Sequence, residues 1–139
     1  YCGVGTIALY LAAQAAHVVG IESVPEAVED ARRNAGHNRI ENAAFIVGRV
    51  EEALPGLIEQ GRRFDVAVLD PPRKGCEPPV LEALAAAGVP RIVYVSCHPE
   101  SLARDLARLA ALGYRIEQVQ PVDMFPMTTH VECVARLSR

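Results

Sequence analysis

Two side chains that can do chemistry follow two successive apolar segments of this 139-residue chain. Asp70 comes directly after the apolar residues 64–69, and Cys97 closely follows the apolar residues 91–95. If these segments are neighbouring parallel strands, their carboxyl ends meet at one edge of a sheet, where α/β folds bind their ligands. A carboxylate and a thiol at that edge predict chemistry on a bound substrate.

Cys97 is the candidate nucleophile among four cysteines. A helix is expected to begin directly after it, and the positive end of a helix dipole favours the thiolate form. Cys76, in the glycine-bearing loop after the first strand end, is the rival nucleophile. A small buried side chain is the other interpretation of a strand-end cysteine. We expect Cys133 to lie in the core and Cys2 to line a glycine turn.

A candidate base lies near the carboxyl end, where residues 123–132 form a loop that enters a strand. Period-two geometry places His130 and Glu132 on the same face of that strand. Loops of this kind often cover a ligand, and an acid at the loop's exit could act as a base beside the thiol. The alternative is that Glu132 is an exposed strand residue.

The chain begins with a glycine turn. Gly3-x-Gly5-x-x-Ala8 matches the dinucleotide fingerprint, in which glycines allow positive φ and close approach of a ligand. Glu22 follows the apolar residues 17–21 at the spacing of an acid that binds ribose hydroxyls. Such turns serve NAD, FAD and S-adenosylmethionine alike. A turn without a ligand, and a helix-capping role for Glu22, are the alternatives.

The segment after the first candidate strand is rigid and then basic. Two prolines fix their own φ and hold Asp70 extended at the strand end. Arg73 and Lys74 follow, where the Asp-Pro-Pro segments of amine methyltransferases have an aromatic residue. Two cations suit a phosphate better than an amine, and an ordinary solvated loop is the alternative.

Short strands alternate with helices along the chain, which predicts an α/β fold with a doubly wound, mostly parallel sheet. We expect helices at residues 6–16, 25–38, 51–60, 79–87 and 99–112, and strands at 17–21, 44–47, 64–69, 91–95, 114–122 and 131–137. Pro55 is expected to interrupt the third helix. No strand precedes the glycine turn, so we expect the first strand of the sheet to lie outside this chain.

Composition sets the class of protein. Half of the residues are apolar and the net charge is −3, which predicts one domain over residues 1–139 and no general basic field for nucleic acid. No membrane-length segment or signal peptide is evident, so the cytoplasm is the expected location. The cysteine spacing fits neither a zinc site nor a disulfide framework, so we expect free thiols and no metal.

The chain resembles the RNA 5-methyluridine (uracil-C5) methyltransferase family over essentially its whole length. Five ordered segments carry the resemblance: YCGVGT at 1–6, GIE at 20–22, DPPRKG at 70–75, VYVSCHP at 93–99, and FP at 125–126 leading to HVE at 130–132. The resemblance implies a Rossmann-like class I fold, S-adenosylmethionine as cofactor and RNA as partner. It implies Cys97 as nucleophile, through a covalent adduct at C6 of uracil, and Glu132 as base. The cofactor-binding residues that it implies are Tyr1, Gly3, Gly5, Thr6, Glu22 and Asp70.

Some positions depart from the family pattern, and they concern contacts rather than the nucleophile. His98 and Thr6 stand where asparagine is common, and Arg49 stands where Asn or Asp is frequent. The family also implies an amino-terminal RNA-binding region, often with an iron–sulfur cluster, outside this chain.

The continuation RKGC at 73–76 is similar to that of members that modify 23S ribosomal RNA, which is the expected substrate, with transfer RNA as the alternative. Two other classes stay open. An NAD-dependent oxidoreductase would use the glycine turn and Glu22 but leaves the segments at 70–73 and 96–99 without a role. A non-catalytic RNA- or adenosyl-binding module would need no nucleophile.

Overall fold

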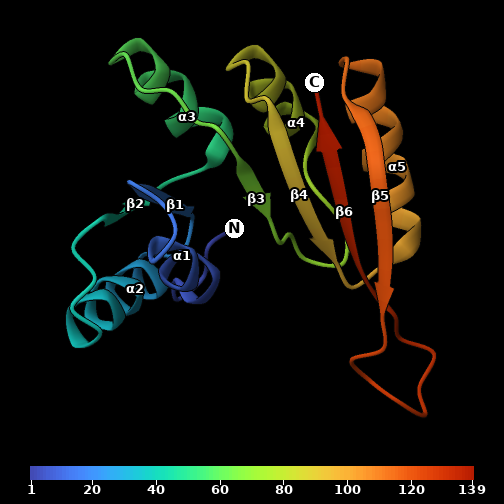
Figure 1. The fold of residues 1–139 in the computed structure, drawn as a ribbon, viewed down its shortest axis with the longest axis horizontal. Helices are drawn as coiled ribbons and strands as arrows, with labels where there is room; N and C mark the ends of the chain where they lie inside the picture. The colour runs from blue at the N-terminus through green and yellow to red at the C-terminus, as the bar shows by residue number, and fades with distance from the viewer. The chain divides into compact units, whose positions relative to one another are not determined.

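The computed structural model describes all 139 residues and divides the chain into two compact units, residues 1–53 and 54–139 (Figure 1). The chain passes from one unit to the other within helix α3 (Val50–Glu59). Each unit carries its own sheet, and each is described by itself below. The expectation of one domain over the whole chain stays a prediction. No helix has both the length and the apolar character that a membrane span requires.

The first unit pairs two parallel strands with two helices. Its elements in chain order are α1 (Thr6–Ala12), β1 (Val18–Glu22), α2 (Pro25–His37) and β2 (Ala43–Val47). Val18 lies opposite Ala43, and Glu22 lies opposite Val47. Pro25 begins α2 because its fixed φ suits the first helical position. The core consists of small helix side chains packed against one aromatic ring: Ala8, Val28, Ala31, Ala35 and Phe45.

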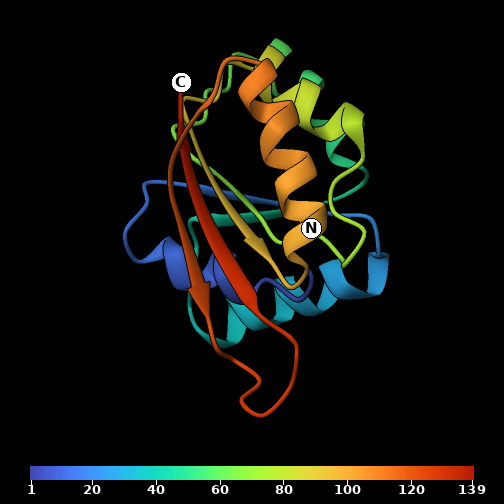
Figure 2. The ribbon, with the colours of Figure 1, turned by 90° about the vertical axis from the view of Figure 1, so that its right-hand side faces the viewer.

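The second unit contains a four-stranded mixed sheet. Its further elements are β3 (Ala67–Leu69), α4 (Pro78–Ala86), β4 (Arg91–Ser96), α5 (Pro99–Ala111), β5 (Arg115–Val122) and β6 (Glu132–Ser138). The strand order is β3-β4-β6-β5, with β3 parallel to β4 and with β6 antiparallel to both of its neighbours. Figure 2 shows α4 and α5 on one face of this sheet. The last strand in the chain therefore lies beside β4.

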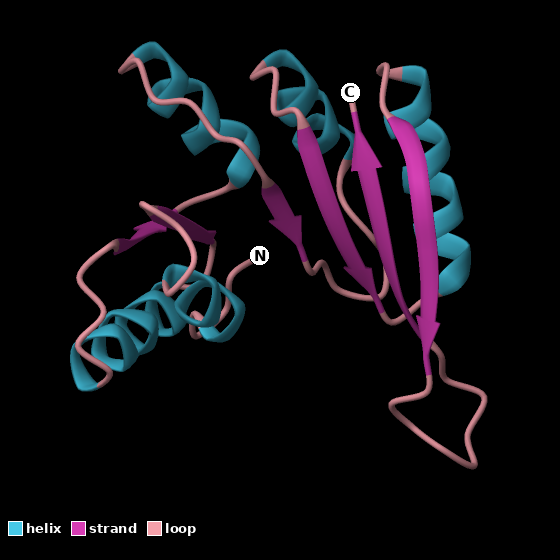
Figure 3. Cartoon of the chain, viewed as in Figure 1, coloured by secondary structure: helices cyan, strands magenta, loops and turns pink.

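Strand β4 is the centre of the second core. Ile92, Tyr94 and Ser96 alternate with less buried residues, as the period of two requires. Leu81, Leu109 and Leu137 complete a layer of fully buried side chains around them. Figure 3 shows the long loop between β5 and β6 extending beyond the sheet at the end where β4 finishes. Whatever β4 carries at its carboxyl end is therefore near that loop.

The predicted elements are all present, with three differences in extent. Helix α1 ends at Ala12 rather than at residue 16, and β3 spans three residues rather than six. Pro55 lies inside α3 without interrupting it, since a proline removes one N–H donor and the remaining bonds continue the helix. Parallel pairing covers β1 with β2 and β3 with β4, and antiparallel pairing is confined to β6 and its two neighbours.

Candidate active site

The register between β4 and β6 aligns the predicted nucleophile with the predicted base. Ser96, the last residue of β4, lies opposite Cys133, the second residue of β6. One step further along both chains, Cys97 and Glu132 occupy facing positions. Directly opposite residues of an antiparallel pair have Cβ atoms about 4.5–5.5 Å apart. Sequence reasoning placed an acid at a loop exit, and the insertion of β6 beside β4 is what aligns that acid with the thiol.

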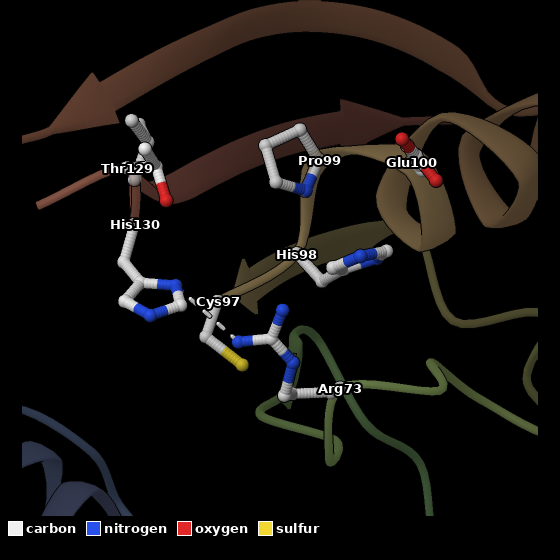
Figure 4. Close-up of a pocket in the computed structure, with 8 residues that line it drawn as sticks. Arg73, Cys97, His98, Pro99, Glu100, Thr129 and His130 are labelled. Atoms are coloured by element: carbon white, nitrogen blue, oxygen red, sulfur yellow. Dashed lines mark hydrogen bonds between the residues drawn. The ribbon is translucent and has the colours of Figure 1, made fainter.

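Cys97 opens into a cavity of about 250 Å³ within the second unit (Figure 4). The cavity walls come from the loop after β3, the start of α5 and the end of the β5–β6 loop: Arg73, Cys97, His98, Pro99, Glu100, Thr129, His130 and Val131. Nη1 of Arg73 lies 3.4 Å from Nδ1 of His130, so a cation stands beside the thiol. Glu132 is not among the lining residues. The predicted face shared by His130 and Glu132 is wrong, because β6 begins only at Glu132.

The two rival cysteines differ in access. Cys97 is partly exposed at the cavity, whereas Cys76 is 4% exposed, and burial raises the pKa of its thiol to about 11. Since a thiolate is the reactive form, Cys76 is poorly suited to nucleophilic attack at neutral pH. Cys133 is buried in the core, as predicted, and all four cysteines are free thiols.

The residue after the nucleophile caps the following helix. Nδ1 of His98 accepts a hydrogen bond from the backbone N–H of Ser101 at 3.3 Å, so His98 is the N-cap of α5. Asparagine is among the best N-cap residues, and the imidazole fulfils the same role here. The departure from the family pattern at this position therefore leaves the helix that follows Cys97 intact.

Asp70 lies at the same sheet edge as Cys97. β3 and β4 are parallel neighbours, with Leu69 opposite Tyr94, which confirms the strand pairing expected from the two apolar segments. The carboxyl group of Asp70 is exposed at one side, yet the surrounding atoms desolvate it and raise its pKa. Of the two following cations, Lys74 forms an ion pair with Glu77 at 2.7 Å, and Arg73 lines the cavity.

The two glycines of the glycine turn have different reasons to be glycine. Gly3 has φ +51°, and a Cβ there would meet nothing within 4 Å, so its outer side is open for a ligand. Gly5 has φ +86°, and a Cβ there would come within 3.0 Å of the Phe45 ring. Gly3 thus leaves space beside the turn, and Gly5 allows the turn to pack on its own core.

Glu22 binds the backbone on both sides of β1. Its carboxylate accepts hydrogen bonds from the N–H of Gly3 at 3.0 Å, of Ser23 at 2.7 Å and of Val24 at 3.1 Å. Burial opposes ionisation, but these hydrogen bonds outweigh it and lower the pKa of Glu22. Because Val24 is the N-cap of α2, the helix-capping alternative describes part of what Glu22 does. The lowered pKa keeps it an acceptor for hydroxyls as well.

The remaining predicted cofactor residues adjoin this turn. The backbone nitrogen of Tyr1 donates to the carbonyl of Ile21 at 2.7 Å, which fastens the start of the turn to β1. Thr6 is the first, exposed residue of α1. An ionised acid, an open glycine and an exposed hydroxyl around one turn fit a ribose-bearing cofactor. These residues belong to the first unit, and Asp70 belongs to the second.

Sequence reasoning missed Asp105. It lies in α5 among other charged residues, where nothing in the pattern separates it from a solvated face, yet it is 2% exposed and bonded to the loop that follows β3. Only the tertiary structure distinguishes it.

Comparison with known proteins identifies similar chains. The family model described as tRNA (uracil-5-)-methyltransferase matches residues 1–139. An uncharacterized RNA methyltransferase of Clostridium acetobutylicum is 55% identical over 139 residues, which is 100% of this chain and 30% of that protein. Another, from Geobacter sulfurreducens, is 58% identical over 137 residues, 99% of this chain and 28% of that protein. The chain therefore spans about a third or less of these relatives.

Solved structures give the same fold. The Pyrococcus abyssi tRNA (uracil-54, C5)-methyltransferase, in complex with S-adenosyl-L-homocysteine, has a TM-score of 0.83 and 41% identity, covering 99% of this chain and 32% of that one. The magnesium protoporphyrin IX methyltransferase of Synechocystis has a TM-score of 0.75 at 17% identity, covering 99% and 70%. These likenesses confirm the predicted fold class, a Rossmann-like class I methyltransferase fold.

Proposed function

This chain belongs to the tRNA (uracil-5-)-methyltransferase family, and on that premise we propose that it methylates C5 of a uridine in RNA through a covalent adduct with Cys97. The observation that carries the proposal is the β4–β6 register, in which Cys97 and Glu132 occupy facing positions. The cavity beside Cys97, with Arg73 at its wall, supports the same assignment.

The reaction needs both residues because C5 of uracil is a poor nucleophile. The Cys97 thiolate adds to C6, and the electron pair of the C5–C6 double bond moves to C5 and the C4 carbonyl. When bound, S-adenosylmethionine supplies an electrophilic methyl group. Glu132 then removes the proton from the methylated C5. The C6–S bond breaks, the C5–C6 double bond returns, and Cys97 leaves as thiolate.

The proposed cofactor site uses the predicted residues around the glycine turn. The carboxylate of Glu22 would accept from the ribose hydroxyls, with the open side of Gly3 leaving room for the adenosine. Tyr1, Gly5, Thr6 and Asp70 are proposed as the other binding residues on the strength of the family resemblance.

The proposed partner is RNA with an accessible loop. A target base must leave its stack to reach a thiol in a cavity, and single-stranded or looped RNA lowers that cost. The net charge of −3 provides no general attraction for a polyanion, so local cations such as Arg73 must serve. We also expect the reaction to take place in the cytoplasm.

We propose 23S ribosomal RNA as the substrate, on the segment RKGC at 73–76. Transfer RNA is the second candidate, because the family model and the Pyrococcus abyssi structure carry that name. Incubation of the full-length protein with labelled S-adenosylmethionine and each RNA separates them, since only the true substrate accumulates label in 5-methyluridine.

The experiment that tests the mechanism traps the adduct. Full-length protein is incubated with S-adenosylmethionine and RNA containing 5-fluorouridine, and then run on a denaturing gel. Fluorine at C5 leaves Glu132 no proton to remove, so a methylated protein–RNA adduct should persist. The band should vanish in Cys97→Ala and remain in Cys133→Ala, a control cysteine buried in the adjacent strand. Absence of a band, despite binding of cofactor and RNA, contradicts the proposal and favours a binding module.

A second variant tests the base. Glu132→Gln should allow addition and methyl transfer but not proton removal, so an adduct should accumulate with ordinary uridine. If Glu132→Gln releases methylated RNA at the wild-type rate, Glu132 is not the base.

A further inference from the structure

The loop that carries Arg73 is held by a buried carboxylate. Oδ2 of Asp105 accepts a hydrogen bond from the hydroxyl of Tyr94 at 2.5 Å and another from the backbone N–H of Cys76 at 2.8 Å. Asp105 is 2% exposed, and Tyr94 is 0% exposed. Burial raises the pKa of Tyr94, which keeps its hydroxyl protonated as a donor. A buried carboxylate is costly unless its oxygens are bonded, and here they are.

The other carboxylate oxygen extends the attachment. Arg104 donates to Oδ1 of Asp105 at 2.8 Å and to the carbonyl of Lys74 at 2.7 Å. Gly75 lies between the two attached loop residues, with φ +81°, and a Cβ there would come within 2.4 Å of Oδ2 of Asp105. The loop therefore approaches α5 more closely than any residue with a side chain would allow.

These contacts connect the loop to the element that presents the thiol. Tyr94 lies three residues before Cys97 on β4, and Asp105 lies on α5, which begins two residues after Cys97. Arg73 lies directly before the attached segment and reaches the same cavity as Cys97. The strand and helix on either side of the thiol thus hold the loop whose cation faces it.

We propose that Tyr94 and Asp105 are positioning residues that set Arg73 against the reacting base beside Cys97. This inference rests on the proposed methyl transfer. It assigns neither residue a contact with substrate. Both act through the loop at 73–76, so their loss should reduce turnover by displacing Arg73 rather than by removing a reacting group.

The chain offers a matched control for Tyr94→Phe. Tyr114 is also buried, at 3% exposed, and its hydroxyl donates to the carbonyl of Val89 at 2.7 Å. Tyr114→Phe removes one buried hydroxyl and its hydrogen bond, as Tyr94→Phe does, but the lost contact lies at the start of β4. The two variants should lower thermal stability alike and differ in their effect on the reaction.

The test measures kcat and KM for methyl transfer in the full-length protein. Tyr94→Phe should lower kcat by about 10- to 100-fold, the scale of a reacting group misplaced by about an ångström, with a smaller change in the KM for S-adenosylmethionine. Tyr114→Phe should retain the wild-type kcat. In an Arg73→Ala background, Tyr94→Phe should add little, because coupled residues are not additive.

A surface pair keeps the test informative if Tyr94→Phe fails to fold. Arg104→Leu removes the bond to Lys74 from an exposed side chain, and Arg108→Leu, one turn later, removes only an ion pair with Glu82. We expect Arg104→Leu alone to lower kcat.

Equal kcat values in the tyrosine pair, or full additivity with Arg73→Ala, overturn the inference. A wild-type protein that transfers no methyl group to RNA overturns the proposed function instead.

Discussion

The ends of β1 and β4 both carry a candidate functional side chain, and the two are treated in opposite ways. Glu22, at the end of β1, accepts hydrogen bonds from three backbone N–H groups within its own unit. Cys97, just past the end of β4, has no hydrogen-bond partner on its sulfur and opens into a cavity. A group that only binds can be fixed in advance, whereas a nucleophile must keep its reactive atom available.

The same contrast separates the two cysteines near the cavity. The loop around Cys76 is fastened by buried hydrogen bonds, and burial suppresses the reactivity of its thiol. Rigidity in the second unit is thus placed around the thiol at Cys97 rather than upon it. The predictions below test this division between fixed and available groups.

The largest effect is expected at Cys97. Cys97→Ala should lower kcat for methyl transfer by more than about 10³-fold, because loss of a covalent nucleophile removes the reaction path itself. Affinity for S-adenosylmethionine should stay near the wild-type value, since the proposed cofactor contacts lie elsewhere. Single-turnover methylation and calorimetric titration of the cofactor measure the two quantities. A variant that keeps a tenth of the wild-type rate is incompatible with a covalent mechanism.

The next effect is expected at Glu22, and it should be the reverse. Glu22→Gln removes the charge that accepts from Gly3 and from the proposed ribose hydroxyls, and hydrogen bonds to charged groups contribute about 1.5–3 kcal/mol each. We expect affinity for S-adenosylmethionine to fall by about 10- to 100-fold, with kcat at saturation little changed. Glu26→Gln, in the exposed first turn of α2, is the control. A large fall in kcat with unchanged affinity would make Glu22 part of the reaction instead.

Local patterns foretold the elements, and tertiary pairing decided what they bring together. Alternating apolar segments were enough to predict β3 and β4 as neighbours, because β-α-β connections have few solutions. The placement of β6 between β4 and β5 was missed, because no local signal states which strand a final strand joins. Asp105 was missed for the same reason, since a charged residue on a helix reads as solvated until its partners are known.

The third prediction concerns packing beneath the fixed end. A Cβ at Gly20 would come within 2.6 Å of the Phe45 ring and 2.8 Å of the sulfur of Cys2. Gly20→Ala should therefore destabilise the first unit by about 1–3 kcal/mol, the usual cost of overpacking. Gly36→Ala, in α2 with open space around it, should instead stabilise by about 0.5–1 kcal/mol. Hydrogen exchange of peptides from residues 18–47 measures both.

The smallest effect is expected from acid titration, and its sign should differ between the two strand ends. The pKa of Glu22 is lowered from its ordinary value of 4.5, so its stabilisation is present above that pH and is lost as pH falls through the folded-state pKa. The melting-temperature difference between wild type and Glu22→Gln should therefore be largest near neutral pH and shrink below about pH 4.5.

Asp70, at the end of β3, should show the opposite sign. Desolvation raises its pKa from 3.8, so its charged form costs stability once pH rises through the folded-state pKa. Asp70→Asn should raise the melting temperature slightly at neutral pH, and that gain should disappear in acid, where wild-type Asp70 is protonated. Differences of the same sign for Glu22→Gln and Asp70→Asn across this range would contradict the contrast. Opposite signs would mean that the backbone fixes Glu22 as an ion, whereas Asp70 is held ready to gain a partner.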